Sequence, residues 1–178
     1  ALKNCALKKG YNQIRISGNE PTIGKNHLLK ILEIIENDGL FNFILETNGI
    51  LIGNNKEYAK ELSKFSRIHV RVSIKGTNEE EFSLLTGALP EQYNLQLKAL
   101  ENLLDYGVSC HPAIMLSFCD KENYKKIRER LMEIDIKFAN MLEEEYVFMY
   151  PHVVERLRRK GIKPKIFYYP NNIPSELI

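Results

Sequence analysis

The sequence lacks any apolar run that approaches the roughly 20 residues a membrane-spanning helix needs. It also begins without the charged, apolar and small-residue succession of a secretory leader. We therefore expect a cytoplasmic protein that has no membrane as a partner.

An excess of charge of one sign is missing as well. The 25 basic residues stand against 23 acidic ones, which leaves a formal net charge of +2. A field this weak neither attracts nor repels nucleic acid strongly. Nucleic acid is therefore not expected as a partner.

Cysteines are few and far apart, at Cys5, Cys110 and Cys119. The nearest two are nine positions apart (119 − 110), a span of roughly 30 Å in an extended segment at about 3.3 Å per residue. No pair of these thiols forms a short chelating loop. We assign no metal ligand and predict three buried, reduced thiols.

The chain is long enough for one domain with a proper interior. It has 178 residues, of which 44% are apolar and 27% charged, as is ordinary for a globular domain. We predict a single domain over residues 1–178. Residues 162–178 are expected to form a C-terminal tail or to cover an edge, because their prolines cannot sustain a helix.

Two kinds of apolar pattern alternate along the chain. A period of two predicts strands, and a spacing of three and four predicts helices. The strands are expected at residues 12–17, 42–47, 68–75, 109–116 and 145–150. The helices are expected at residues 1–9, 26–37, 56–65, 79–85, 90–106, 121–134 and 153–160. The alternation suits consecutive right-handed βαβ units, which gives an α/β fold with a mostly parallel sheet backed by helices.

The strand at residues 68–75 has polar side chains along one whole face. His69, Arg71, Ser73 and Lys75 alternate with apolar residues. Four such side chains need a wet or ligand-filled cavity beside them, and a covering helix would leave them no room. The pattern favours a curved, barrel-like sheet. An edge strand with one solvated face is the alternative.

The first predicted strand leads directly into the turn Ser17-Gly18-Asn19-Glu20-Pro21. Backbone groups in such a turn have no partners in a strand ladder. They are therefore free to face a small polar molecule at the carboxyl end of a parallel sheet. The turn predicts a ligand-binding site.

Three segments together carry a family resemblance: residues 15–21 (Arg-Ile-Ser-Gly-Asn-Glu-Pro), 46–49 (Glu-Thr-Asn-Gly) and 71–75 (Arg-Val-Ser-Ile-Lys). Their order and spacing resemble radical S-adenosylmethionine (SAM) enzymes, particularly those similar to the pyruvate formate-lyase activating enzyme. The resemblance covers about residues 13–152. It implies a partial (βα)6 TIM-like barrel with outer helices, of which this chain lacks the first strand.

The resemblance also implies which residues contact SAM. These are Ser17, Gly18, Asn19, Glu20, Thr47, Asn48, Ser73, Lys75, His111 and His152. Glu20 would accept or orient the ammonium of SAM, and Lys75 would meet its carboxylate. Asn19 stands where the family usually has a second glycine, and asparagine accepts a positive φ at modest cost.

The defining motif of the family, Cys-x3-Cys-x2-Cys, is not in the sequence. In the family it holds a 4Fe-4S cluster that chelates SAM. We expect this motif to lie upstream of Ala1, so that the chain is a fragment covering strands two to six; a naturally cluster-free relative is the alternative. The isolated fragment is expected to be inactive and to bind SAM weakly.

The resemblance implies an enzyme that reductively cleaves SAM to a 5′-deoxyadenosyl radical, which then abstracts hydrogen from a protein or small-molecule substrate. An electron donor such as flavodoxin or ferredoxin would be a partner. Two other classes remain open. One is a cluster-free module that binds SAM or a nucleotide for regulation, and the other is a lyase that uses Lys75 as a Schiff-base nucleophile.

Overall fold

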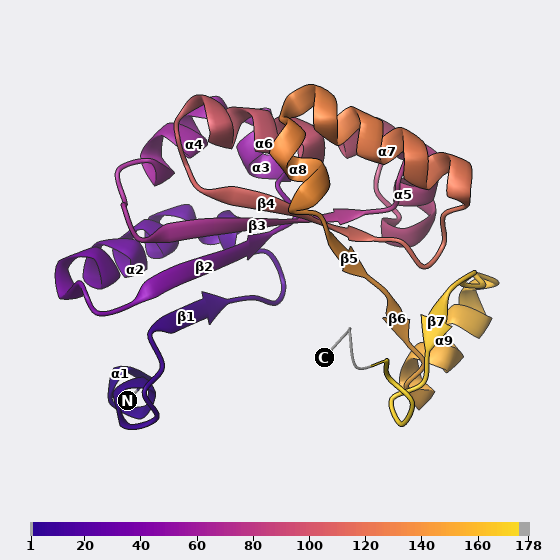
Figure 1. Cartoon of the computed structure of the whole chain (residues 1–178), viewed down its shortest axis with the longest axis horizontal. Coiled ribbons are helices and arrows are strands. Elements are labelled where there is room, and N and C mark those ends of the chain that lie inside the picture. The colour runs from indigo at the N-terminus through magenta and orange to yellow at the C-terminus, as the bar shows by residue number, and fades with distance from the viewer. Residues whose placement is uncertain (1, 175–178) are drawn as a thin grey trace.

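The computed structural model describes residues 2–174, which form one curved parallel sheet with helices on its outer face (Figure 1). The strands of this sheet are β1 (Gln13–Ile16), β2 (Asn42–Thr47), β3 (Ile68–Lys75), β4 (Cys110–Met115) and β5 (Glu143–Glu145). They pair in chain order, and every pair is parallel. The predicted α/β fold with a partial-barrel sheet is confirmed.

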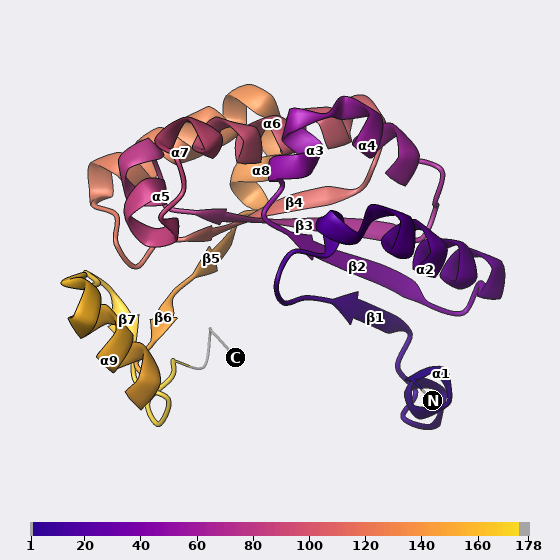
Figure 2. The ribbon, with the colours of Figure 1, turned by 180° about the vertical axis from the view of Figure 1, so that it is seen from behind.

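Helices separate the strands, as the alternating pattern predicts. They are α1 (Leu2–Lys8), α2 (Lys25–Asp38), α3 (Ile50–Asn54), α4 (Lys56–Leu62), α5 (Glu79–Thr86), α6 (Tyr93–Asp105), α7 (Lys121–Ile134), α8 (Ile136–Asn140) and α9 (Pro151–Lys160). Seen from behind, α2 to α7 lie over the sheet (Figure 2). The opposite face of β1, β2 and β3 is turned toward the viewer in Figure 1, and none of the described helices is drawn over these strands.

The core lies between the sheet and these helices. Val70, Val72 and Ile74 of β3 are completely buried, and so are Leu100 and Leu103 of α6. Burial of each such side chain contributes about 1.5 to 3 kcal/mol, which fixes the face of β3 that turns to the helices. The polar residues between them must then face the other, concave side.

The edge-strand alternative for residues 68–75 is wrong, because β3 is the central strand with β2 on one side and β4 on the other. Arg71 is nevertheless only 4% exposed. The polar face is therefore buried at Arg71 and Ser73 and half-buried at its two ends, His69 and Lys75.

The last predicted strand is wrong in its position. In place of a strand at residues 145–150, β5 ends at Glu145, and β6 (Val147–Phe148) pairs with β7 (Phe167–Tyr168) in a separate small sheet. Three consecutive glutamates have low strand propensity, which hid β5 from the sequence. The strand forms because β4 pairs with it.

Other elements differ in smaller ways. The helices α3 and α8 and the strand β7 were not predicted, and α6 is preceded by a short 3-10 helix at Pro90–Gln92. Cys5 is exposed, against the expectation of three buried thiols. Ala1 and residues 175–178 of the predicted first helix and tail lie outside the described residues.

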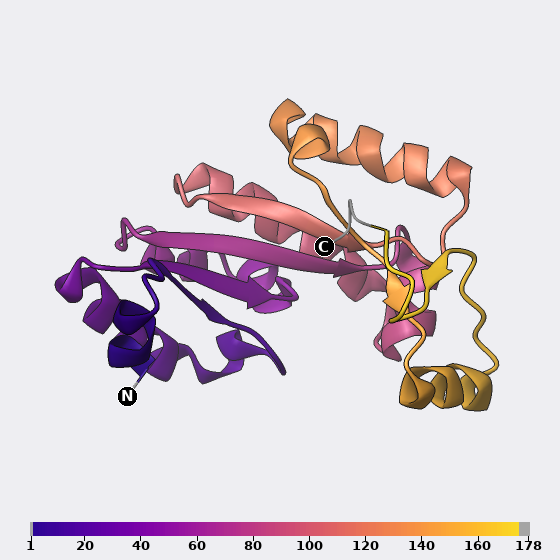
Figure 3. The ribbon, with the colours of Figure 1, turned by 60° about the horizontal axis from the view of Figure 1, so that its bottom comes forward.

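The C-terminal elements extend beyond the sheet. Figure 3 shows α9 with β6 and β7 beyond the end of β5. Among the described residues, no helix combines the length and apolarity needed to cross a membrane.

Candidate functional site

A cavity of about 150 Å³ opens at the carboxyl ends of the first three strands. Its walls comprise Gly18, Asn19, Glu20, Glu46, Thr47, Asn48, Ser73 and Lys75. Seven of these eight residues were predicted as site residues; the eighth, Glu46, was not. Parallel strands end at the same edge of a sheet, so residues far apart in the sequence meet there. We call this space the carboxyl-end cavity.

The turn after β1 takes a left-handed path. Gly18 has a φ of 90° and Asn19 a φ of 51°. Asparagine tolerates this region, so the departure from glycine at position 19 is structurally accommodated. Within the described part of the chain, the backbone carbonyls of Gly18 and Asn19 accept no hydrogen bond, so they can accept one from a ligand ammonium.

Glu20 holds this turn against the end of β2. Its Oε1 accepts hydrogen bonds from the Thr22 backbone N–H (3.1 Å), the Thr22 hydroxyl (2.6 Å) and the Thr47 hydroxyl (2.6 Å). Its Oε2 accepts one from the Asn48 backbone N–H (2.7 Å). A carboxylate has about four acceptor positions, so Glu20 mainly positions the turn, and one lone pair of Oε2 remains for a ligand.

Lys75 reaches the cavity from the end of β3. Its ammonium donates to the Ser73 hydroxyl and to Glu145 Oε2, both at 2.8 Å. Since an ammonium has three protons, one is left for a ligand carboxylate.

An ion network around the buried Arg71 lies on the concave face, next to the cavity. Arg71 binds Glu143 with two hydrogen bonds of 2.7 and 2.8 Å, and it contacts Glu46 at 2.6 Å and Glu145 at 2.7 Å. A guanidinium suits this geometry because its donors form a rigid fork. The network fixes β2, β3 and β5 relative to one another.

The network also sets the ionisation of its carboxylates. The hydrogen bonds from Arg71 lower the pKa of Glu143 to about 2. Burial opposes ionisation of Glu145, but Lys75 and Arg71 outweigh that effect and lower its pKa. Both groups therefore stay charged at neutral pH.

Sequence reasoning missed the acidic members of this network. Glu46 lies at the position next to Thr47 that faces the concave side, and strand alternation alone predicts that orientation. Glu143 carried no usable signal, because it precedes the strand expected at residues 145–150, and Glu145 was expected at the beginning of that strand, whereas it ends β5.

Three predicted site residues do not line the carboxyl-end cavity. Ser17 lies just before Gly18 and is exposed. His111 lies on β4 beside Arg71, where its Nδ1 is 2.6 Å from His69 Nε2 and its Nε2 is 3.1 Å from Glu143. Burial, and secondarily His111, lowers the pKa of His69. His152 is exposed on α9 and stacks on Tyr150 at 5.9 Å between ring centroids.

The cavity has the donor and acceptor set that the methionine part of SAM requires. Two free carbonyls and a carboxylate lone pair suit its ammonium, and Lys75 suits its carboxylate. The described residues do not suit a 4Fe-4S cluster. No group of three metal-binding side chains occurs among them, and burial raises the pKa of Cys110 to about 12 and of Cys119 to about 11, which disfavours the thiolates such a cluster needs.

The half-barrel sheet and the cavity at its carboxyl edge define a (βα)-type cofactor-binding domain. The model of the radical SAM superfamily matches residues 1–134. The chain belongs to the radical SAM superfamily, and the predicted family is confirmed. The cofactors of this superfamily are SAM and a 4Fe-4S cluster, as the resemblance implies.

Curated relatives are similar over part of their length. A protein of Methanococcus vannielii called a probable GTP 3′,8-cyclase is 36% identical over 86 residues, which is 48% of this chain and 28% of the relative. The GTP 3′,8-cyclase of Peptoclostridium acidaminophilum is 27% identical over 138 residues, 76% of this chain and 42% of the relative. The chain thus spans less than half the length of these relatives.

Solved structures support the fold. SuiB of Streptococcus suis bound to S-adenosylmethionine aligns with a TM-score of 0.61 and 16% identity, over 94% of this chain and 40% of that one. The protein anSMEcpe with bound AdoMet and a peptide aligns with a TM-score of 0.59 and 22% identity, over 75% of this chain and 37% of that one. At these identities the likeness shows a shared fold.

Proposed function

We propose that this chain is the SAM-binding part of a radical SAM enzyme and holds SAM in the carboxyl-end cavity. The observation that carries this proposal is the meeting of seven predicted residues, from the ends of three strands, around one cavity. The Gly18 and Asn19 carbonyls accept hydrogen bonds from the ammonium of SAM, and Lys75 pairs with its carboxylate. Glu20 holds the turn in place.

The cavity is too small for the whole cofactor. At about 150 Å³ it lies below the roughly 300 to 1,000 Å³ typical of small-molecule sites, so it accommodates the methionine part. A neighbouring hollow of about 320 Å³ shares Lys75 and has Met115 and Phe148 in its wall. These apolar side chains suit the adenine ring, and we place the adenosyl part there.

In the complete enzyme, SAM would be cleaved reductively to a 5′-deoxyadenosyl radical that takes a hydrogen atom from the substrate. That electron transfer needs a cluster whose ligands the described residues do not provide. The share of this chain is to bind and orient SAM and to exclude water from it. The chain alone is therefore expected to be inactive.

We include two candidate substrates of the full protein in this proposal. The sequence resembles activating enzymes, whose substrate is a protein, and a flavodoxin or ferredoxin would then supply the electron. The curated relatives named GTP 3′,8-cyclases favour a nucleotide as the second candidate.

The two alternative classes of protein, a Schiff-base lyase and a cluster-free regulatory module, require different properties of the site. A Schiff-base lyase needs a neutral Lys75, but its ammonium is paired with Glu145. A regulatory module that binds SAM without redox chemistry needs only the same cavity. A full reading frame with the cysteine motif would exclude the regulatory module.

Calorimetric titration of the chain with SAM tests the proposal. We expect a dissociation constant in the range of about 1 mM, equivalent to about −4 kcal/mol. Gly18→Val should abolish detectable binding, because a β-branched residue is strained at a φ of 90°. Asn19→Gly is the matched control, since glycine adopts a positive φ freely, and it should bind as the parent does.

Equal binding by the Gly18→Val variant would show that SAM binds elsewhere. A dissociation constant in the nanomolar range would contradict the expectation of weak binding, and the chain would then need no cluster contact for affinity. Reduction with borohydride in the presence of a carbonyl compound should leave Lys75 unmodified.

A further inference from the structure

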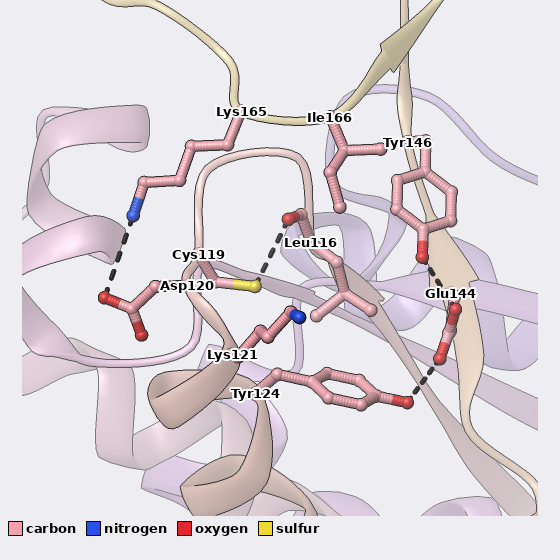
Figure 4. Close-up of a pocket in the computed structure, with 9 residues that line it drawn as sticks. All are labelled: Leu116, Cys119, Asp120, Lys121, Tyr124, Glu144, Tyr146, Lys165 and Ile166. Carbon is pink, nitrogen blue, oxygen red and sulfur yellow. Dashed lines mark hydrogen bonds and ion pairs between the residues drawn. The ribbon is translucent and has the colours of Figure 1, made fainter.

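A second and larger cavity lies on the outer side of β5, between the start of α7 and the segment that leads into β7 (Figure 4). Its volume of about 560 Å³ is within the range of small-molecule sites. Leu116 and Ile166 supply apolar wall. Tyr124, Glu144 and Tyr146 gather on one side of it. We call this space the tyrosine pocket.

Glu144 faces this pocket because side chains alternate along β5. Its neighbours Glu143 and Glu145 both point to the concave face, where they bind Arg71. Glu144 has no cationic partner among the described residues. Its carboxylate accepts hydrogen bonds only from two tyrosine hydroxyls.

These hydroxyls give the pocket a wall of acceptors. Tyr124 donates to Glu144 Oε1, and Tyr146 donates to Glu144 Oε2 at 2.7 Å. Burial and the hydrogen bond to Glu144 raise the pKa of Tyr146, so its hydroxyl keeps its proton. The Tyr124 oxygen also accepts a hydrogen bond from Arg128 Nη1 at 3.2 Å, so the Tyr146 oxygen and the Glu144 carboxylate are the groups that offer lone pairs and one negative charge to a ligand.

The remaining charges limit the ligand further. Lys165 is paired with Asp120 at 3.7 Å, and Lys121 enters the pocket from the start of α7 with no such pairing among the described residues (Figure 4). A second positive group on a ligand would meet this free ammonium. Cys119 donates its thiol proton to the Leu116 carbonyl, and burial raises its pKa to about 11, so it is a neutral wall residue.

We propose that the tyrosine pocket binds an organic monocation, an alkylammonium or alkylguanidinium group with an apolar body. The cationic group pairs with Glu144 beside the ring of Tyr146, where cation–π attraction adds to the ion pair, whereas the Arg128 guanidinium already lies 5.7 Å from the centroid of the Tyr124 ring. The apolar body lies against Leu116 and Ile166.

The position of the pocket relates this ligand to the reaction. The hollow that we assign to the adenosyl part of SAM also has Glu144 and Tyr146 in its wall. A cationic group held in the tyrosine pocket would therefore anchor a substrate next to the cofactor. This role as an anchor rests on the proposed function, whereas the binding of a monocation does not.

Titration of the chain with hexylamine, followed by the shifts of tyrosine resonances in NMR spectra, tests the proposal. Hexanol and hexanoate have the same apolar length without the positive charge. We expect hexylamine to bind about tenfold tighter than either, from a charge-assisted hydrogen bond. It should also bind tighter than 1,6-diaminohexane, which Lys121 repels. Equal affinity for hexylamine and hexanol would overturn the proposal.

Two variants locate the binding. Glu144→Gln keeps the shape of the pocket and should weaken hexylamine binding about tenfold. Glu122→Gln makes the same charge change on the exposed surface of α7, where Glu122 is 69% exposed, and should have no effect. Tyr146→Phe, which keeps the ring and loses one acceptor, should have an intermediate effect. Unchanged binding by Glu144→Gln would refute the assignment.

A SAM titration of a further variant of the tyrosine pocket separates the two proposals. Tyr124→Phe removes one hydrogen bond to Glu144 and should leave SAM affinity unchanged, because Tyr124 lines neither the carboxyl-end cavity nor the hollow that we assign to the adenosyl part. Hexylamine binding by a chain that fails to bind SAM supports the tyrosine pocket and overturns the proposed function alone.

Discussion

Replacement of Glu20 by glutamine tests how the turn after β1, which we propose binds SAM, is held in place. The carboxylate accepts four hydrogen bonds, from the backbone and hydroxyl of Thr22, the hydroxyl of Thr47 and the backbone of Asn48. A glutamine side chain replaces one oxygen with an NH2 group, which cannot accept. In either orientation, at least one backbone N–H then faces another donor.

The magnitude follows from the contact that is lost. A hydrogen bond to a charged group contributes about 1.5 to 3 kcal/mol, so we expect Glu20→Gln to lower the free energy of unfolding by about 2 kcal/mol. For a chain of 178 residues this corresponds to a fall in the melting temperature of about 4 to 8 °C. Thermal unfolding followed by circular dichroism measures it.

Glu33→Gln is the matched control. Glu33 is 51% exposed on α2 and forms a surface ion pair with Lys30 three residues away, so its loss should cost less than about 0.5 kcal/mol. Thr47→Val completes a double-mutant cycle, because its hydroxyl lies 2.6 Å from Glu20 Oε1. The coupling free energy should be about 1 kcal/mol. A coupling near zero, or equal melting of the Glu20 and Glu33 variants, would refute the reasoning.

Two further predictions concern packing and pH. Gly53→Ala should lower the melting temperature by at least about 6 °C, because its Cβ would lie 1.9 Å from the Leu95 carbonyl oxygen. Gly24→Ala is the control, because its Cβ would meet His27 Cβ at 4.0 Å, and it should have the same melting temperature as the parent. Similar melting temperatures of the two variants would contradict this prediction. The lowered pKa of Glu143 contributes stability above its usual value of 4.5, which is lost as pH falls toward about 2. The stability advantage of the parent over Glu143→Gln should therefore vanish across that interval, and a constant difference would contradict the assignment.

Much of the fold could be predicted from the sequence. The bounds of β2, β3 and α7 agree with the prediction. Each has a regular apolar pattern that defines the one face it can turn toward the core. The turn at Gly18 was identified by its residue types, since glycine and asparagine permit a left-handed path there. The family followed from the same segments and is confirmed by the superfamily match.

The sequence alone determined the order of strands and helices, the alternation of β3 and the residue types of the turn after β1. Only the tertiary structure decided that Glu143, Glu145 and Glu46 surround Arg71, because these contacts join strands that are far apart in the chain. It also decided that Glu144 faces the tyrosine pocket, since β5 forms only by pairing with β4. Local patterns fix local conformation, whereas ion pairs between distant strands depend on the register in which those strands meet.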